Sequence, residues 1–416
     1  METFKSAVRA TIYSGGDART FEHTNANKSF YHASHWWAVL PNGANWYVED
    51  GANFSRKASP AMLGTTARAD IAFDDAHDKL WVLNYGPAIT EPHLYRLGYK
   101  SSNATWVKEA DVPVGSVSGL TSGNWAKNGE LTLGLDPSGD PLIASVGSSR
   151  SGSIGLHVAY ALSGTTFRSW SETTIDPGTT RDGGSNGDSK AVFVDYTAGT
   201  TPRIALAYSA DGATNSWKIA THSDAAGSAF SGGWSTSVFA TASQVSIDNH
   251  ISAVSDGDTI YIAMKDSKNA VWVTKGNPGH WTAPVKAVNG GSEHDPSRPT
   301  LVLDDTDDRL FLFYQDHTGS PHDIYYKSVS SGSLIYDPHD LGTPVIAMSG
   351  KAFSNPQLPA HNVGADTGGQ FYAFASSGQE IWSSAFDLDA VQPPAHAAVN
   401  EMRESINGSP SDYFLV

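Results

Sequence analysis

The sequence predicts an all-β fold, a seven-bladed β-propeller of four-stranded antiparallel blades. Short alternating runs of apolar and polar residues, separated by turns, recur along the 416 residues. The chain has 40 glycines, 12 tryptophans, 16 tyrosines and 16 phenylalanines, but only 17% charged residues. This composition suits short strands and tight turns. Similar strand–turn–strand units also repeat at intervals of about 50–60 residues, which is typical of propeller blades.

The clearest pair of repeats is "ADIAFDDAHDKLWVLNYG", residues 69–86, and "PTLVLDDTDDRLFLFYQD", residues 299–316. Each contains a strand, an acidic turn, a basic residue and an aromatic strand. Five further units with this layout begin at His35, Glu130, Lys190, His250 and Asn355. Most units continue with one or two more strands, so a typical unit holds the four strands of a propeller blade.

The two ends of the chain complete the predicted ring. The last unit shows three strands, and residues 6–14 can supply a fourth, which would remove the open edge of the ring. We therefore expect one propeller domain over residues 1–416, with a C-terminal tail over 391–416 that carries a short helix at 394–406. Two separate β-sandwich domains are the alternative, but no linker or change in composition divides the chain.

Charge and composition narrow the classes of partner. The net charge is −16, and no basic stripe indicates a nucleic-acid surface. No apolar run approaches the roughly 18 residues of a membrane-spanning helix. The absence of cysteine excludes disulfides, thiolate zinc sites and cysteine nucleophiles. We expect a monomer, secreted or extracellular although no signal peptide is visible, that binds neither nucleic acid nor membrane.

Propeller geometry divides the polar residues between two faces. On one face, called the loop face below, the chain enters the innermost strand of each blade, and the loops between second and third strands return to it. The opposite turn face carries the turns between first and second strands, where the acidic segments "DDAHD", "DPSGD", "SDGD" and "DDTDD" are expected to be solvated turn formers. The inner-strand starts would bring to the loop face His35, Arg68 or Asp70, Glu130, Lys190, His250, Arg298 and Asn355.

Further polar residues are expected on the loop face. The loops between second and third strands add His93, Arg150, Lys265, His317 and His322, and the approach to Arg298 adds His294 and Asp295. Basic residues would therefore concentrate on one face of an acidic protein. Histidine recurs at matching places in "HASHWWAVLPNGANWYVEDG" and "DNHISAVSDGDTIYIAMKD", and aromatic residues that could stack on sugar rings flank the first, namely Tyr31, Trp36 and Trp37.

Histidines, an arginine and a lysine around one funnel suit a glycan that contains uronate. Arg298 would bind the carboxylate bidentately, which acidifies the C5 proton, and a neutral histidine would remove that proton. We therefore expect a polysaccharide lyase that acts on an acidic polysaccharide or oligosaccharide by β-elimination. Its catalytic residues would be His35, His250 and Arg298. Its substrate-binding residues would be Arg68, Asp70, Glu130, Arg150, Lys190, Trp36, His322 and Tyr31.

Alternatives remain open. A glycoside hydrolase needs two carboxylic acids about 5–10 Å apart, and Asp70 and Glu130 are the central candidates. A lectin would repeat one pocket in every blade, whereas the residues of the loop face differ between blades. A scaffold for protein partners is also compatible with a propeller. Ca²⁺ or Zn²⁺ could occupy the central channel, although no H-x-H or H-E-x-x-H spacing supports a metal.

Two segments resemble known propeller families. "YSADGATNSWKIA", residues 208–220, resembles the Asp box of sialidase-like propellers, with Ser209, Asp211, Gly212 and Trp217 at its positions. The resemblance implies a structural turn away from an active site, and the arginine triad of sialidases is not recognisable. "DNHISAVSDGDTIYIA" is similar to a blade start in propeller polysaccharide lyases, such as ulvan lyases and enzymes that cleave the rhamnosyl–glucuronate linkage. That resemblance implies a lyase for acidic polysaccharides.

Overall fold

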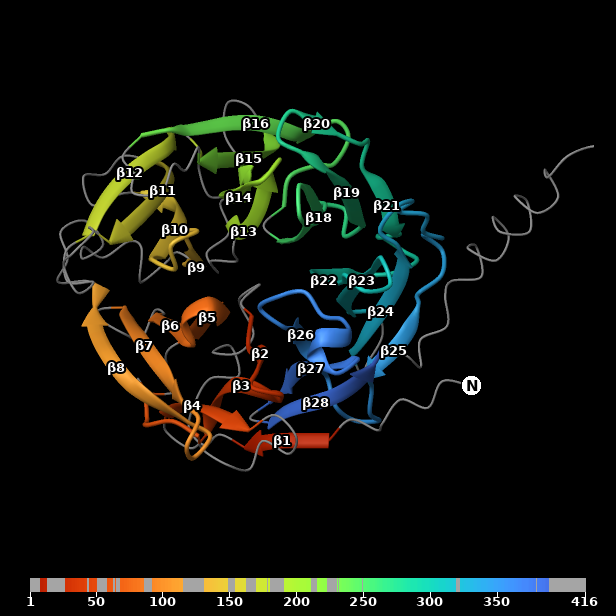
Figure 1. Ribbon diagram of the computed structural model, residues 1–416. Helices are drawn as coiled ribbons and strands as arrows, with labels where there is room; N and C mark the ends of the chain where they lie inside the picture. Colours follow the sequence, from red (N-terminus) through yellow and green to blue (C-terminus); the bar gives the residue numbers. More distant parts are fainter. Residues whose placement is uncertain are drawn as a thin grey trace, which may run out of the picture.

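The computed structural model describes residues 8–12, 27–42, 45–50, 58–62, 64, 68–85, 92–114, 131–148, 154–161, 170–177, 179, 191–210, 215–222, 230, 232–248, 250–318, 322–378 and 380–388. The strands of these residues form seven antiparallel sheets in a ring around a central axis (Figure 1). The predicted seven-bladed β-propeller is therefore confirmed. These residues contain no α-helix, and the helix predicted at 394–406 lies outside them.

The first four blades each begin with their innermost strand. Blade 1 consists of β2 (Ser29–His32), β3 (His35–Asn42) and β4 (Asn45–Asp50). Blade 2 consists of β5 (Arg68–Asp74), β6 (Lys79–Tyr85), β7 (His93–Lys100) and β8 (Thr105–Pro113). Blade 3 consists of β9 (Thr132–Leu135), β10 (Pro141–Ser148), β11 (Ile154–Ala161) and β12 (Trp170–Pro177). Blade 4 consists of β13 (Ala191–Ala198), β14 (Thr201–Ala210), β15 (Ser216–His222) and β16 (Trp234–Thr241).

The remaining three blades follow the same plan. Blade 5 consists of β17 (Ile251–Asp256), β18 (Thr259–Lys265) and β19 (Val271–Asn277), with β20 (His280–Trp281) and β21 (Val285–Val288) both paired to β19. Blade 6 consists of β22 (Pro296–Asp304), β23 (Arg309–Asp316), β24 (Asp323–Ser330) and β25 (Thr343–Ile346). Blade 7 consists of β26 (Ser354–Gln357), β27 (Gln370–Ser377), β28 (Glu380–Asp387) and β1 (Val8–Ile12).

Apolar side chains fill the spaces between neighbouring blades. One cluster joins Leu142 and Val158 of blade 3 to Leu206 of blade 4, and equivalent clusters follow around the ring. A middle strand is therefore covered on both of its faces. This explains why β23 is buried along its whole length, and why its sequence, "RLFLFYQD", is apolar at consecutive positions instead of alternating.

The ring closes at its rim and near its axis. At the rim, β1 pairs antiparallel with β28, so the N-terminal strand is the outermost strand of blade 7. Near the axis, Ser29 of β2 forms a parallel bridge with Pro359, and its carbonyl accepts a hydrogen bond from Ala360 N–H at 2.8 Å. Both contacts join segments from opposite ends of the chain, and both protect strand edges that would otherwise be open.

A cavity of about 270 Å³ lies along the axis of the ring. The inner strands of blades 2 to 6, Asn27 and the segment 359–362 line it. The amide of Asn362 donates a hydrogen bond to the Ser255 carbonyl at 2.7 Å, so this segment of blade 7 reaches past blade 6 to blade 5. The axis is therefore a narrow, partly crossed channel.

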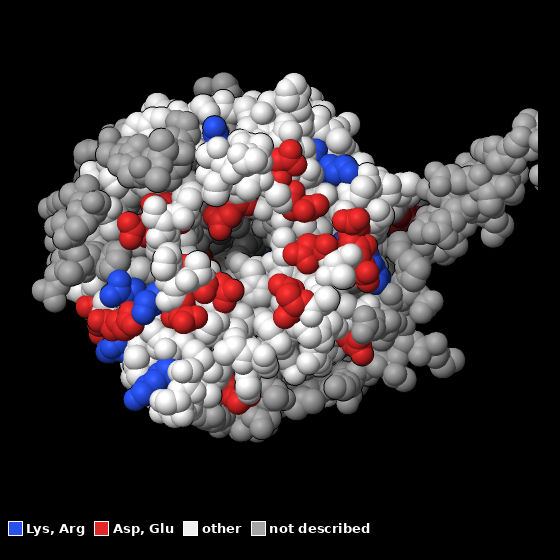
Figure 2. All heavy atoms as spheres, in the orientation of Figure 1, with Lys and Arg blue, Asp and Glu red and all other residues white. Residues whose placement is uncertain are grey.

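Acidic side chains gather on the turn face around this channel (Figure 2). Burial and the charges of neighbouring carboxylates raise the pKa of Asp305, and those neighbours come from the turns of three blades, namely Asp366, Asp304 and Asp256. Asp195 lines the channel, where its carboxyl is exposed to the lumen but surrounded by protein. Burial and the nearby Asp136 raise the pKa of Asp195 to about 7. The turn face is therefore a surface of mutually repelling carboxylates.

Candidate functional site on the loop face

His250 and Arg298 lie at the loop-face ends of neighbouring inner strands. His250 directly precedes β17 of blade 5, and Arg298 is the third residue of β22 in blade 6. A hydrogen bond from Leu301 N–H to Ser252 Oγ, 3.0 Å long, ties the two strands together. The sequence predicts both residues at the starts of inner strands, which is where they lie.

His250 belongs to a buried chain of charged groups. Its Nδ1 lies 2.7 Å from Asp248 Oδ1, and Lys265 Nζ donates to Asp248 Oδ2 at 2.9 Å. Burial would raise the pKa of Asp248, but the hydrogen bond from His250 and the charges of His250 and Lys265 lower it to about 2. Asp248 is therefore ionised and holds the proton of the imidazole on Nδ1, which leaves Nε2 as the basic nitrogen.

Arg298 is held in an unusual position. Its backbone is left-handed, with a φ of 55°, at a register shift between Ser297 and Thr300 in the pairing of β22 with β23. Its Nη1 donates to Gln315 Oε1 at 3.0 Å. The guanidinium is half-buried and forms no ion pair with a carboxylate of the described residues. A charge that is partly removed from water without a counter-ion favours the binding of an anion.

Two stacked histidines lie beside Arg298. The rings of His317 and His322 are 4.7 Å apart and inclined by only 8°. Burial, and then the positive charge of Arg298, lower the pKa of His317 to about 4. His317 Nε2 is buried without a hydrogen-bond partner in the described part of the chain. His317 is therefore neutral near physiological pH, and it adds an imidazole to this polar region without adding charge.

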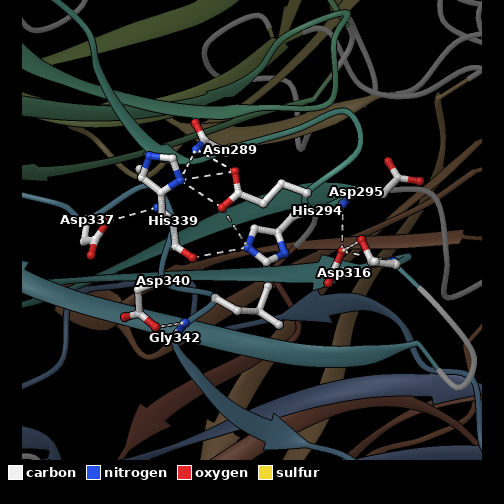
Figure 3. A network of polar contacts seen from close by, with 12 residues as sticks. Asn289, His294, Asp295, Asp316, Asp337, His339, Asp340 and Gly342 are labelled. Carbon is white, nitrogen blue, oxygen red and sulfur yellow. Dashed lines mark hydrogen bonds and ion pairs between the residues drawn. The ribbon is translucent and has the colours of Figure 1, made fainter.

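A polar network supports the segment that leads into β22 (Figure 3). Glu293 Oε1 lies 2.9 Å from His339 Nδ1, and Asn289 Nδ2 donates to Glu293 Oε2 at 3.0 Å. Asp295 N–H donates to Asp316 Oδ1 at 2.9 Å, as Figure 3 also shows. These contacts fix residues 289–295 against the outer loop of blade 6 and thereby hold the approach to Arg298.

His35 does not join this group. The innermost strand of blade 1 is β2, and His32 pairs with His35 across a turn of Ala33 and Ser34, whose φ angles are 52° and 62°. His35 therefore begins the second strand of its blade, beside the turn face. The predicted equivalence of His35 and His250 is wrong, because His250 precedes an inner strand and His35 starts a second strand. The short inner strand β2 and its turn, which contains no glycine, come before His35.

Two predicted aromatic ligands of sugar pack against each other, and one of them, Trp36, is buried. Trp36 is only 5% exposed, and it stacks on His361 with ring centroids 5.9 Å apart. The ring of Tyr31, on β2, lies 5.4 Å from that of Trp36. Trp36 is therefore part of the apolar cluster between blades 1 and 7, and the half-buried Tyr31 packs against it.

The remaining predicted residues have different positions. Arg68 is buried at the loop-face end of β5. Asp70 is buried two residues further along, where its Oδ1 accepts Ile71 N–H at 2.9 Å and its Oδ2 accepts Leu133 N–H of blade 3 at 2.8 Å. The Asp70 carboxylate is therefore used to join two blades. Three predicted residues lie outside the described residues, namely Glu130, Arg150 and Lys190.

No metal centre is formed by the residues that the structure describes. Among them, no group of three or more histidine, aspartate or glutamate side chains could hold a metal ion. The binding of Ca²⁺ or Zn²⁺ in the central channel stays a prediction, and the described residues provide no set of ligands for it. Within the same residues, no helix has the length and apolar character needed to cross a membrane.

Sequence-based prediction missed the two side chains that orient His250 and Arg298, namely Asp248 and Gln315. Asp248 stands two positions before His250 in "DNH", a signal that could have indicated the pair. Gln315 lies at the end of β23, where nothing in "FYQDH" distinguishes it. The turn of the segment that resembles an Asp box, residues 211–214, lies outside the described residues, so its position away from an active site stays a prediction.

Comparisons with known proteins concern the fold alone. No protein-family profile matches the sequence. No curated protein matches it either. Solved structures with a similar arrangement include an arginine-substituted mutant of AofleA from Arthrobotrys oligospora, with a TM-score of 0.47, 13% identity, and coverage of 79% of this chain and 86% of that chain.

Two further solved structures are similar at the same level. The polysaccharide lyase Uly1 has a TM-score of 0.44 and 10% identity, over 92% of this chain and 99% of that chain. The sialidase of Trypanosoma rangeli has a TM-score of 0.45 and 9% identity, over 79% of this chain and 58% of that chain. Such low values assign no activity, so function has to be argued from the residues of the site.

Proposed function

We propose that this protein is an extracellular carbohydrate-active enzyme, a polysaccharide lyase that cleaves a uronate-containing glycan by β-elimination on the loop face. The observation that carries the proposal is the Arg298 guanidinium. It is half-buried, oriented by Gln315, and without a carboxylate partner among the described residues. A planar cation in this state suits the carboxylate of a uronate, which it can bind through two parallel hydrogen bonds.

A base for the reaction lies on the neighbouring blade. With Arg298 on the uronate carboxylate, the C5 proton becomes more acidic. His250 Nε2, which is buried in this structure and has to be uncovered by the substrate, then accepts it while Asp248 holds Nδ1–H. The electron pair of the C5–H bond then forms a C4–C5 double bond as the C4–O bond breaks. The leaving oxygen takes a proton, which the His250 imidazolium can return, so protons and electrons balance.

Substitution of Arg298 tests the proposal. The assay offers soluble polysaccharides that contain glucuronate, iduronate, galacturonate or mannuronate, and follows the ultraviolet absorbance of the unsaturated uronate product. We expect Arg298→Gln to lower kcat/KM by about tenfold to a hundredfold, the worth of a charged hydrogen bond. Arg298→Lys keeps the charge but loses the bidentate geometry, so its kcat/KM should lie between those of Arg298→Gln and the wild type.

The matched control is Arg203→Gln, because Arg203 lies near the turn face in β14. This variant should keep full activity. New reducing ends without the ultraviolet product would indicate a hydrolase, and binding without any product would indicate a lectin. Either result, or full activity in Arg298→Gln, would contradict the proposal of a lyase with this site.

A further inference from the structure

Two neighbouring inner strands share the same unusual backbone conformation. Arg298 in β22 and Asn355 in β26 have φ angles of 55° and 51°, and each lies at a register shift of its strand. Every other non-glycine residue with a positive φ in the described part of the chain lies outside strands. A left-handed residue costs on the order of 1 kcal/mol, so its recurrence at matching places in two blades indicates a function.

The Asn355 side chain carries a second cost. Asn355 is only 2% exposed, and neither Nδ2 nor Oδ1 has a hydrogen-bond partner in the described residues. Buried amides are normally paired, and an unpaired one costs about 1–3 kcal/mol. Asparagine tolerates a positive φ better than most residues do, which can explain the residue type but not the unpaired amide.

Gln315 brings these two residues together. Its Oε1 accepts Arg298 Nη1 at 3.0 Å and Asn355 N–H at 3.4 Å. Its Nε2 donates to the Phe353 carbonyl at 2.7 Å, and the side chain is 2% exposed. The guanidinium and the Asn355 backbone therefore converge on a single oxygen, so a small ligand bound to Arg298 lies beside Asn355.

We infer that Arg298 and Asn355 form one subsite for a carboxylate that carries a neighbouring hydroxyl group. The guanidinium takes the carboxylate, and the Asn355 amide, which offers both a donor and an acceptor, takes the hydroxyl. This deepens the proposed function and rests on it, because it names the part of the uronate that is recognised. Since both amide atoms are buried, binding requires the protein that covers them to move.

The probe for this subsite is sodium D-glucuronate, with D-glucose as the uncharged comparison. Binding is measured by titration calorimetry, and folding by thermal unfolding. Asn355→Gly removes the amide and fits the left-handed backbone, so we expect a folded protein whose Kd for glucuronate rises at least about tenfold. Asn355→Asp keeps the shape but places a negative charge beside the ligand, so we expect a larger loss of affinity.

The matched control is Asn269→Gly, an asparagine with a φ of 61° outside this subsite. It should keep glucuronate binding unchanged while showing a similar change of Tm. If Asn355→Gly binds glucuronate like the wild type, the role of Asn355 is only to adopt the left-handed backbone conformation, and the inference is wrong. It is also wrong if the wild type does not bind glucuronate, or prefers glucose.

Turnover separates this inference from the proposed function. If no polysaccharide is cleaved but glucuronate binding depends on Asn355, the subsite stands and the lyase activity is wrong. If uronate polysaccharides are cleaved and Asn355→Gly neither raises KM nor weakens glucuronate binding, the lyase activity stands and the subsite is wrong.

Discussion

At the scale of single residues, the loop face contains ionisable groups whose protonation is set by burial. His317 is the clearest case, because burial and Arg298 lower its pKa to about 4. An unfolded histidine has a pKa of about 6.5. Between these two values the unfolded chain binds more protons than the folded protein does, so the free energy of unfolding contributed by His317 falls as the pH drops through this window.

We therefore expect His317→Gln to lose this part of the pH dependence. Relative to the wild type, the variant should become more stable as the pH falls from about 6.5 to about 4. Urea unfolding across that range measures the difference, with His35→Gln, at the exposed first residue of β3, as the control. A difference between variant and wild type that does not change with pH would contradict the assignment. This measurement does not depend on the proposed activity.

At the scale of strands and blades, inner strands are joined by side chains as well as by apolar packing. Asp70 accepts a backbone N–H from blade 3, Ser252 accepts one from blade 6, and Thr300 donates to the Pro356 carbonyl of blade 7 at 3.2 Å. Burial raises the pKa of Asp70 to about 6, although the Lys28 ammonium and backbone N–H groups lower it. Neighbouring inner strands are therefore joined by side-chain-to-backbone hydrogen bonds that use different residue types, and both directions of donation, around the ring.

We expect Asp70→Ala to destabilise the protein by about 2–4 kcal/mol, because it leaves the buried N–H groups of Ile71 and Leu133 without an acceptor. Asp70→Asn keeps one acceptor oxygen and should cost clearly less. Urea unfolding at neutral pH compares the two variants with the wild type. Equal stability of Asp70→Ala and the wild type would show that apolar packing alone holds blades 2 and 3 together.

The strands could be predicted wherever apolar residues alternate or run together between turns, as in blades 2 to 6. Blade 1 was misplaced because β2 has four residues and its turn contains no glycine. His250 and Arg298 could be placed because they stand at strand starts. Gln315 and Asn355 could not be joined, since a hydrogen bond between two strands leaves no pattern in either sequence.

At the scale of the whole molecule, charge opposes the proposed substrate. The net charge is −16, and carboxylates surround the channel on the turn face (Figure 2). A polyanionic glycan is therefore repelled at long range, while the half-buried Arg298 attracts its carboxylate at short range. Salt screens exposed charges more strongly than buried ones, so the two effects respond differently to ionic strength.

We expect KM for a long uronate polysaccharide to fall as the ionic strength rises from about 0.01 M to about 0.15 M, because the Debye length shrinks from about 30 Å to about 8 Å and the repulsion weakens. KM for a short oligosaccharide, which carries fewer charges, should change less. Initial rates at several salt concentrations measure both. A KM that rises with salt for the long polymer would instead mean that long-range attraction guides binding, and the predicted repulsion by the acidic protein would then be wrong.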